Sequence, residues 1–557
     1  MCNLSQGLSD TVKEFTTTGI CNPEKHYMVD ISERLKEIKG MVDAGKYFCI
    51  NRARQYGKTT TLSALRKYLS PLYEVISVSF QGIGESGFRT EENFVQSFCR
   101  LLRKQRQAWS AMPDQIMRKL EGILEREANL ARLDELFEVL SDWCVCSDKL
   151  IVLMIDEVDS ASNNQVFLDF LAQLRDGYLE REANPKAGVF QSVILAGVTD
   201  IKHLKSRIRP EDTSKFNSPW NIAADFDIDM SLPADGICGM LDEYEMDHHT
   251  GMNTSEIARE IYDFTEGYPF LVSRICQKMA KRYEGGRSSG GDMQNANGGS
   301  ACDDVQPGVW SLAGVSEAVR DILMEKNTLF DSLMGKVYDN HDLSDVLQRI
   351  LFGGDRIPYN PDSIPAMDGE MYGFVKNRDG ALGIANRIFE TRLYNYFLSV
   401  FEMKDSPMSR AGASERDRFI SKGHLDMESL LKHYAVVFGD VYEEKAEPFD
   451  EEEGRRRFLL FIRPVINGTG NYYIETRTRD DKRMDLVIDY LGERYVIEMK
   501  IWRGIAYHEK GEVQLAGYLD SYHLDTGYML TYSFNQKKNK GITYRVVNGK
   551  KLIEAIV

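Results

Sequence analysis

The stretch Tyr-Phe-Cys-Ile-Asn-Arg-Ala-Arg-Gln-Tyr-Gly-Lys-Thr-Thr, residues 47–60, decides the fold of this chain. A short apolar run leads into a polar loop and then into a helical pattern, so we expect a strand, a loop and a helix in that order. Amides at the start of a helix can cradle phosphates, while Lys58 can reach the terminal phosphates and Thr59 can hold Mg²⁺. The predicted nucleotide-binding residues are Arg54, Gln55, Tyr56, Gly57, Lys58, Thr59 and Thr60.

The loop departs from the usual pattern Gly-x-x-x-x-Gly-Lys-Ser/Thr at its first position, where this chain has Arg52. The Gly-Lys-Thr end, which carries the contacts to phosphate and metal, is present. The turn geometry that the first glycine normally permits is therefore an open question. The triplet alone is weak evidence for a nucleotide site.

A second motif downstream strengthens the prediction. Residues 149–162, Lys-Leu-Ile-Val-Leu-Met-Ile-Asp-Glu-Val-Asp-Ser-Ala-Ser, form an apolar run that ends in acids. In P-loop enzymes the first acid after such a strand holds the Mg²⁺ shell, and the second orients the attacking water. We assign these roles to Asp156 and Glu157, with a solvated strand end as the alternative. The two motifs in this order favour nucleotide binding.

Further apolar runs alternate with helical patterns around these motifs. The runs lie at 73–80 and 192–198, and the helical patterns lie at 91–147 and 165–182. Continuously apolar strands that alternate with helices are typical of a parallel sheet covered on both faces. We therefore expect such a sheet in the first part of the chain.

Two pairs of polar residues follow the apolar run at 192–198. Thr199 and Asp200 would end a strand beside the nucleotide, where Thr199 could sense its terminal phosphate; a capping turn is the equal alternative. Arg207 and Arg209 come where an arginine could neutralise charge, although most such arginines are surface residues.

Length, composition and charge limit the class of protein. The chain has 557 residues, too many for one hydrophobic core, so we expect two to four domains. It has neither a membrane-spanning apolar run nor a secretory signal, which favours a cytoplasmic location without a membrane partner. The nine scattered cysteines predict reduced thiols and no structural metal. A net charge of −16 argues against a non-specific nucleic-acid coat, but residues 533–557 carry six Lys and Arg against one Glu.

Shifts in composition predict the domain boundaries. We expect a P-loop ATPase domain at 1–230 and a helical lid at 231–403. The Gly, Ser and Asn-rich segment 284–308 has almost nothing to bury and predicts a flexible insertion in the lid. The polar, turn-rich segment 404–425 predicts a linker, and a further domain occupies 426–557.

The lid ends in a pattern typical of a winged-helix unit. Residues 371–397 contain two strand-like pieces around an Asn-Arg-Asp-Gly turn, followed by a helix. The expected fold class is therefore α/β: a P-loop parallel sheet with a helical and winged-helix lid, and a separate C-terminal domain.

The C-terminal domain contains a second candidate site. Residues 484–500, Met-Asp-Leu-Val-Ile-Asp-Tyr-Leu-Gly-Glu-Arg-Tyr-Val-Ile-Glu-Met-Lys, predict a β-hairpin that turns near Gly492. Glu498 and Lys500 would share one face of a strand, and the turn would bring Asp485 opposite them. Two carboxylates and one ammonium suit Mg²⁺-dependent phosphodiester hydrolysis. The alternative is a strand pair with solvent-facing charges, although charges within an apolar strand are costly unless they serve a site.

Four stretches resemble the AAA-ATPase-like proteins of bacteria, relatives of the STAND and archaeal-ATPase groups: YFCINRARQYGKTT, LIVLMIDEVDS, VILAGVTDIKHL and TEGYPFLVSRIC. The loop of that family usually reads Arg-Pro-Arg-Arg-Phe-Gly-Lys-Ser, so Arg52 is normal there. The resemblance spans roughly residues 10–400. It implies ATP and Mg²⁺ as cofactors and a winged-helix lid whose sensor segment contains Gly267 and Pro269.

The segment from about 428 to 535 resembles the PD-(D/E)XK nuclease superfamily, which implies a restriction-endonuclease-like α/β fold. Asp485 and Glu498-Met499-Lys500 match its signature, with Asp485 and Glu498 as metal ligands. Gln514 and Tyr518 are four apart on a predicted helix and match the QxxxY helix of the helicase-associated branch.

The nuclease resemblance also implies a carboxylate from the first core helix. Glu453 is the candidate and Glu475 the rival. The proline of the signature is absent, because Met484 precedes Asp485, but its absence removes no metal ligand.

The favoured hypothesis is an ATPase whose nucleotide state controls a Mg²⁺-dependent endonuclease, with DNA favoured over RNA as substrate. The competing hypothesis is an ATP-driven STAND-like switch whose C-terminal domain binds nucleic acid or a partner without cleavage. A translocase motor is a weaker reading, because the sequence shows one nucleotide site, although a homo-oligomer could supply the second lobe.

Overall fold

The computed structural model divides the chain into two compact units. The first unit comprises residues 1–249, 267–277 and 368–373, and the second comprises 250–266, 278–367 and 374–557. The described residues within them are 13–125, 131–162, 164–184, 187–198, 201, 219–290, 308–352, 356–402, 407–414, 416–421, 424–442, 448–449, 451–466, 470–473, 486–491, 493–534 and 541–557. The domain boundaries expected from composition remain predictions.

The first unit is built on the expected parallel sheet. Its strands are β1 (Phe48–Asn51), β2 (Glu74–Ser79), β3 (Ile151–Asp156) and β4 (Ser192–Gly197), in the order β1-β4-β3-β2. All of the pairings are parallel. The carboxyl ends of β1 and β3 therefore meet at one edge of the sheet with β4 between them, and this edge carries both nucleotide motifs.

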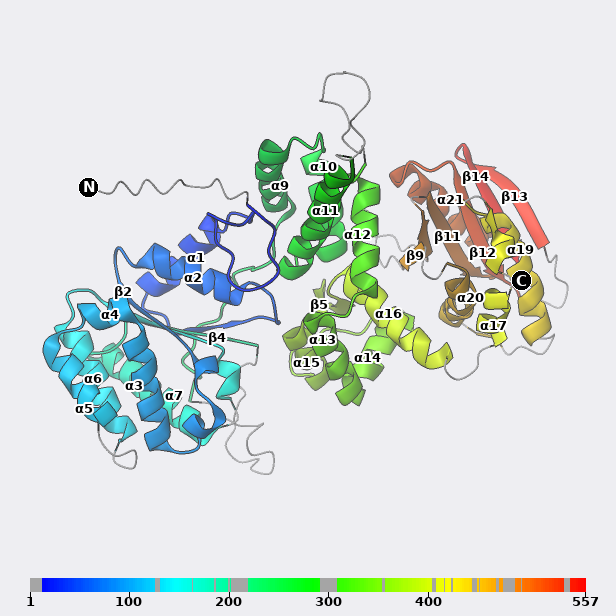
Figure 1. Ribbon diagram of the computed structural model, residues 1–557. Helices are drawn as coiled ribbons and strands as arrows, with labels where there is room; N and C mark the ends of the chain where they lie inside the picture. Colours follow the sequence, from blue (N-terminus) through cyan, green and yellow to red (C-terminus); the bar gives the residue numbers. More distant parts are fainter. Residues whose placement is uncertain are drawn as a thin grey trace, which may run out of the picture. The chain divides into compact units, whose positions relative to one another are not determined.

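Helices cover both faces of this sheet. Successive residues of a strand point to opposite sides, so an apolar strand has side chains to bury on both faces. Figure 1 shows α1 and α2 on one side of the sheet and α3 and α7 on the other. Val152 and Met154 pack in one core with α1 and α2, whereas Leu153 and Ile155 pack in another with α3, α6 and α7. The helices are α1 (Ser32–Asp43), α2 (Lys58–Leu69), α3 (Glu91–Lys104), α4 (Arg106–Ala111), α5 (Asp114–Glu125), α6 (Leu133–Cys146) and α7 (Gln165–Ala183). Burial on both faces explains why the two central strands are continuously apolar, from Ile151 to Ile155 in β3 and from Val193 to Ala196 in β4, rather than alternating.

A mainly helical region follows the sheet in the sequence. Its helices are α9 (Ala234–His248), α10 (Thr254–Thr265), α11 (Pro269–Gly290), α12 (Leu312–Met324), α13 (Thr328–Asp339), α14 (His341–Phe352), α15 (Ile364–Tyr372) and α16 (Arg387–Glu402). Side chains cap several of their first turns: Asn253 accepts from the amide of Glu256, and Ser311 accepts from that of Gly314. The helical content predicted for this region is confirmed.

The two predicted strand pieces form an antiparallel pair, β5 (Val375–Arg378) and β6 (Ala381–Ile384). The turn between them places Asp379 and Gly380 at positive φ, and the Asn377 side chain accepts from the amide of Gly380 at 2.9 Å. Helix α16 follows the pair in the sequence. The strand, turn and helix order of the winged-helix expectation is therefore present.

The C-terminal part of the second unit contains a six-stranded sheet in the order β13-β14-β12-β11-β10-β9. Its strands are β9 (Gly470–Tyr473), β10 (Leu486–Tyr490), β11 (Glu493–Ile501), β12 (Thr526–Tyr532), β13 (Gly541–Val547) and β14 (Lys550–Ile556). β10 and β11 form the predicted hairpin, with Leu486 opposite Ile497. β11, β12 and β14 run parallel to one another.

Helices lie against both faces of this second sheet. Gly511 of α21 (Ile505–Ser521) approaches Lys500 and Met529, so α21 covers the face that carries these side chains. On the other face, the Tyr532 hydroxyl lies 2.9 Å from that of Tyr434 in α19 (Met427–Tyr442) and donates to the carbonyl of Gly454 in α20 (Glu451–Ile466). The sheet is thus the middle layer of an α/β domain.

The segment 404–425 differs from the predicted linker. It contains α17 (Pro407–Ser414), α18 (Arg416–Phe419) and the short strands β7 (Ile420–Ser421) and β8 (His424–Leu425). Met408 and Phe419 are buried. Gly412 comes so close to α20 that a Cβ there would lie 1.9 Å from the carbonyl oxygen of Phe461. The small residues that resembled a flexible linker instead allow two helices to approach each other closely.

The predicted flexible insertion, 284–308, begins inside α11, which continues to Gly290; residues 291–307 lie outside the described part of the chain. In the part of the chain that the structure describes, no helix combines the length and apolar character needed to cross a membrane.

Candidate functional site

The loop between β1 and α2 folds around the side chain of Lys58. Gln55 and Gly57 adopt positive φ of 57° and 80°, which turns the chain sharply before the helix starts. The Lys58 ammonium donates to the carbonyls of Arg52 at 2.8 Å and Ala53 at 2.9 Å, and the residue is only 8% exposed. The predicted lysine is therefore held at the loop, at the amino end of α2.

Neighbouring carboxylates stabilise the buried Lys58 ammonium. Burial lowers the pKa of the Lys58 ammonium, while the neighbouring carboxylates of Asp159, Glu157 and Asp156 act in the opposite direction. A cation surrounded by acids near a helix amino end suits a bound Mg²⁺-nucleotide, in which phosphate charge and metal charge both need partners.

The two predicted metal residues lie in direct contact. The Thr59 hydroxyl donates to Asp156 Oδ2 at 2.7 Å, and the other oxygen, Oδ1, accepts from the amide of Glu157 at 2.9 Å. Asp156 is 8% exposed at the end of β3, whereas Thr59 is exposed at the start of α2. A hydroxyl and a carboxylate brought together in this way are hard oxygen ligands of the kind Mg²⁺ prefers. The residues present therefore fit the Mg²⁺ that the sequence predicted.

Glu157 follows in a strained conformation, with φ of 55°. Burial raises the pKa of its carboxyl, and the nearby negative charges of Asp156 and Asp159 add to this effect. A carboxylate with a raised pKa is a better acceptor for a proton from water. This environment suits the predicted role of orienting and activating water.

Asp159 is a site residue that sequence reasoning missed. One of its oxygens, Oδ2, accepts from the amide of Val198 at 2.7 Å, which ties the turn after β3 to the end of β4. The third acid of the Asp-Glu-Val-Asp sequence was the available signal. The predicted Thr199, Asp200, Arg207 and Arg209 lie outside the described residues.

Arg52, which stands where the usual motif has its first glycine, makes contacts outside the loop. Its guanidinium donates to the carbonyls of Asn51 at 2.8 Å and Ile228 at 2.9 Å, and lies over the ring of Phe226. Burial lowers the pKa of Arg52, and the neighbouring carboxylates of Asp229 and Asp227 act against this. Arg52 therefore anchors the loop to the segment 226–228 rather than reaching into the loop.

A remote segment of the same unit packs on the other side of the loop. The Tyr268 hydroxyl donates to the carbonyl of Arg54, and its ring meets that of Tyr56 edge-on at 4.8 Å. Gly267, at φ of 72°, approaches Leu232 so closely that a Cβ would lie 2.3 Å from the carbonyl oxygen. The family resemblance places Gly267 and Pro269 in a sensor segment, and Tyr268, which lies between them in the sequence, makes this contact with the loop.

The other predicted loop residues differ in their exposure to solvent. Arg54 and Gln55 are exposed, Tyr56 is half-buried, and the Thr60 hydroxyl accepts from the amide of Cys21 at 3.3 Å. Thr60 thus contributes to positioning the N-terminal segment. Its role in nucleotide binding remains a prediction.

The second candidate site lies on β11 beneath α21. Glu498 is fully buried, and its carboxylate pairs with the Lys500 ammonium at 2.7 Å on the same face of the strand. On α21, the Gln514 amide donates to the Tyr518 hydroxyl at 2.6 Å. These predicted pairs are therefore each in contact. Asp485, their predicted partner, lies outside the described residues, as does Glu475.

The predicted helix carboxylate, Glu453, pairs with two arginines of its own helix, Arg456 and Arg457. Another acid of α20, Glu451, reaches the end of β11: it accepts from the amide of Ile501 at 3.3 Å and from the hydroxyl of Tyr507 at 3.1 Å. The sequence carried no signal to choose Glu451 within its acidic run. The geometry makes Glu451 a second candidate for the helix carboxylate.

Comparisons with known proteins give limited similarity. No protein-family model and no curated protein matches the chain. A Walker-type ATPase of Pyrococcus abyssi is similar in structure, with a TM-score of 0.44, 14% identity, and coverage of 68% of this chain and 99% of its own. The ORC2 protein of Aeropyrum pernix with ADPNP and ADP has a TM-score of 0.37 and 13% identity, and the match covers 67% of this chain and 93% of its own. Cdc6p of Pyrobaculum aerophilum has a TM-score of 0.32 and 12% identity, and the match covers 69% of this chain and 97% of its own. The function therefore rests on the geometry of the two sites.

The anchoring role of Arg52 leads to a first prediction. Arg52→Gly restores the usual motif but removes the guanidinium bonds to the loop and to Ile228, so we expect the chain to lose about 1–3 kcal/mol of stability without binding nucleotide more tightly. Denaturant unfolding and nucleotide calorimetry measure the two effects. Arg54→Ala, in the exposed part of the same loop, is the control for stability and should leave it unchanged. Tighter nucleotide binding by Arg52→Gly would contradict the anchoring role.

Proposed function

We propose that this protein binds and hydrolyses ATP with Mg²⁺ at the loop between β1 and α2. The observation that carries the proposal is the hydrogen bond from Thr59 to Asp156, at the edge of the sheet where Lys58 begins α2. Lys58 would contact the terminal phosphates, and Thr59 and Asp156 would hold the metal. Glu157 would then orient the water that attacks the terminal phosphate.

The proposed reaction requires the site mainly to position the reactants and to neutralise charge. Phosphoryl transfer is catalysed mainly by positioning and by neutralising charge, which the metal supplies when bound. The chain supplies Lys58 for the phosphates and a carboxylate with a raised pKa, Glu157, for the water proton. Tyr56 and Tyr268, whose rings are in contact, would hold the loop in shape while the nucleotide binds.

We further propose that the C-terminal domain is a Mg²⁺-dependent DNA endonuclease controlled by the nucleotide state. The buried pair of Glu498 and Lys500 supports this, because a charged pair inside an apolar strand is costly unless it serves a site. Glu498, with Asp485, would hold the metal, and Lys500 would position water or stabilise charge on the phosphate. Gln514 and Tyr518 would orient the substrate from α21.

A different function accounts for the same pair. Glu498 is fully buried and neutralised by Lys500, as it would be in a domain that only binds nucleic acid or a partner. In that case ATP binding would act as a switch, and the C-terminal domain would not cut. Metal binding at Glu498 separates the two, since a domain that does not cut has no need of a metal there.

For the nucleotide site, Lys58→Ala should abolish ATP binding in calorimetry, because it removes the cation for the terminal phosphates. Lys67→Ala, on the exposed face of the same helix, is the matched control and should bind normally.

Glu157→Gln should bind ATP but hydrolyse it at least about a hundredfold more slowly. Because the pKa of Glu157 is raised, hydrolysis by the unaltered chain should fall on acidification at a higher pH than an ordinary glutamate would give. Either an unchanged ATP affinity in Lys58→Ala or an unchanged hydrolysis rate in Glu157→Gln would contradict the proposed ATPase site.

For the nuclease site, the full chain should cut plasmid or linear DNA in Mg²⁺ or Mn²⁺, with a rate that depends on ATP. Lys500→Ala should cut at least about a hundredfold more slowly. Lys510→Ala, exposed on α21, should cut like the unaltered chain. The endonuclease proposal fails if the unaltered chain leaves both DNAs intact with and without ATP. Retained DNA binding in that case supports the switch.

A further inference from the structure

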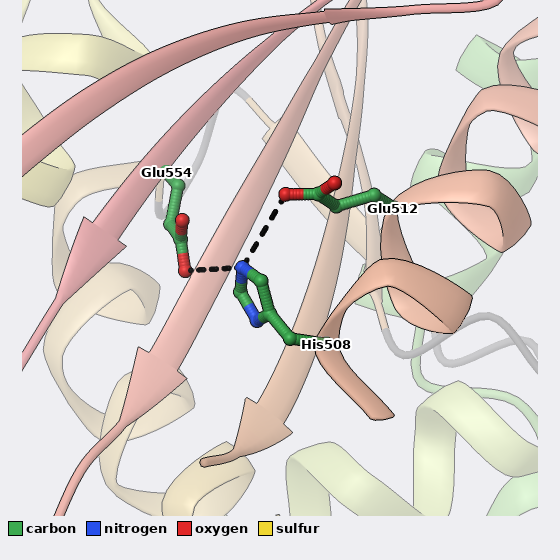
Figure 2. Close-up of side chains that lie close together, drawn as sticks. All are labelled: His508, Glu512 and Glu554. Atoms are coloured by element: carbon green, nitrogen blue, oxygen red, sulfur yellow. Dashed lines mark ion pairs between the residues drawn. The ribbon is translucent and has the colours of Figure 1, made fainter. Parts of the chain in front are cut away.

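A buried group of three ionisable side chains lies apart from both candidate sites. His508 and Glu512 are four residues apart on one face of α21, and Glu554 points toward them from β14 (Figure 2). Their exposed fractions are 3%, 7% and 2%. One ligand atom from each can be chosen so that all three lie within 4.8 Å of one another. Carboxylates are almost never buried in this way without a partner or a metal ion.

The distances in this group fit a shared centre better than a set of hydrogen bonds. His508 Nε2 lies 3.2 Å from Glu554 Oε1 and 3.4 Å from Glu512 Oε1. One ring nitrogen carries at most one hydrogen, so it cannot donate well to both carboxylates. Among the described residues, His508 Nε2 and Glu512 Oε1 find no hydrogen bond of acceptable geometry, although Glu512 Oε1 forms an ion pair with Arg545. Two buried polar atoms are thus aimed at the same small space.

A metal ion would satisfy this arrangement. Ligands about 2.0–2.2 Å from a tetrahedral ion lie about 3.4 Å from each other, close to the two distances from His508. An imidazole with two carboxylates suits first-row transition metals rather than Mg²⁺, which prefers oxygen ligands alone. Thr531 and Thr543 donate to the two oxygens of Glu554 at 2.7 and 3.2 Å, as residues that orient a metal ligand do.

Arg545 is the group that the ion would displace. Its guanidinium lies 2.8 Å from Glu512 Oε1, and 49% of its side chain is exposed. A half-exposed arginine can turn into solvent at little cost, because solvent screens its ion pair. Without a metal, Arg545 and His508 would be the partners of the two carboxylates. This network is the alternative that the test must exclude.

We propose that His508, Glu512 and Glu554 bind one first-row transition-metal dication, with Zn²⁺ the best match, at a site that joins α21 to β14. The site is distinct from the Glu498 site. In the register of the sheet Glu554 lies opposite Met529, which lies opposite Glu498, so the two glutamates are two strands apart, roughly 10 Å between backbones. One ion cannot reach both.

The same helix covers both sites, which gives the metal a function. α21 carries His508 and Glu512, approaches Lys500 through Gly511, and also carries Gln514 and Tyr518. An ion that fixes the first turns of α21 to β14 would hold the helix in position above Lys500. The proposal does not depend on whether the C-terminal domain cuts DNA.

The test is calorimetric titration of Zn²⁺ into the full chain, freed of metal by chelation and without nucleotide. The background variant Glu498→Gln removes one predicted ligand of the other candidate metal site in this domain. On that background we expect one Zn²⁺ per chain, with Mg²⁺ binding much more weakly. Glu512→Gln and Glu554→Gln should each weaken Zn²⁺ binding by about a hundredfold or more, whereas Glu509→Gln, exposed on the same helix, should not.

Two further measurements keep the outcome decisive. Zn²⁺ should raise the melting temperature of the background chain and of Glu509→Gln but not that of Glu512→Gln, because only a ligand bound to the folded state stabilises it. Co²⁺ should give visible absorption bands on the background chain that His508→Gln lacks. If the background chain binds no Zn²⁺, or if Glu512→Gln and Glu554→Gln bind it as well as Glu509→Gln, the group is a charge network only and the proposal is overturned.

Discussion

The contact between the Thr59 hydroxyl and the Asp156 carboxylate is the interaction on which the first unit depends. It joins the start of α2 to the end of β3, although β4 lies between β1 and β3 in the sheet. The contact requires three parallel strands to end at one edge, and parallel strands require helices on both faces to bury them. The buried central strands, the helices on both faces and the strand order thus all serve to bring a hydroxyl, an ammonium and three carboxylates close together.

The loop itself is held from two sides by residues distant in the sequence. Arg52 ties its beginning to Ile228, and Tyr268 ties its middle to a segment that Gly267 allows to pack tightly against Leu232. Both anchors lie in the same unit as the nucleotide site. The loop between β1 and α2, which lacks the first glycine of the motif, therefore keeps its shape through tertiary contacts in place of local backbone freedom.

The sequence predicted those parts of the structure that local pattern determines. Apolar runs identified β1 to β4, and alternation around Leu-Gly-Glu identified the hairpin of β10 and β11. The sequence did not predict contacts between residues that lie far apart in the chain. The anchoring role of Arg52 depends on residues 226–228, and the packing of Gly412 depends on α20. The group at His508 depends on the place of β14 in the sheet, because only the four-residue spacing to Glu512 was visible in the sequence.

The dependence of ATP affinity on Mg²⁺ in the Asp156→Asn chain tests the central claim most directly. Calorimetry with Mg²⁺ and with a chelator gives the contribution of the metal to ATP binding. The account predicts that the unaltered chain binds ATP more tightly with Mg²⁺, and that Asp156→Asn loses this difference but retains binding through Lys58. If Asp156→Asn keeps the full difference, Asp156 and Thr59 do not hold the metal, and the assignment of the nucleotide site is wrong.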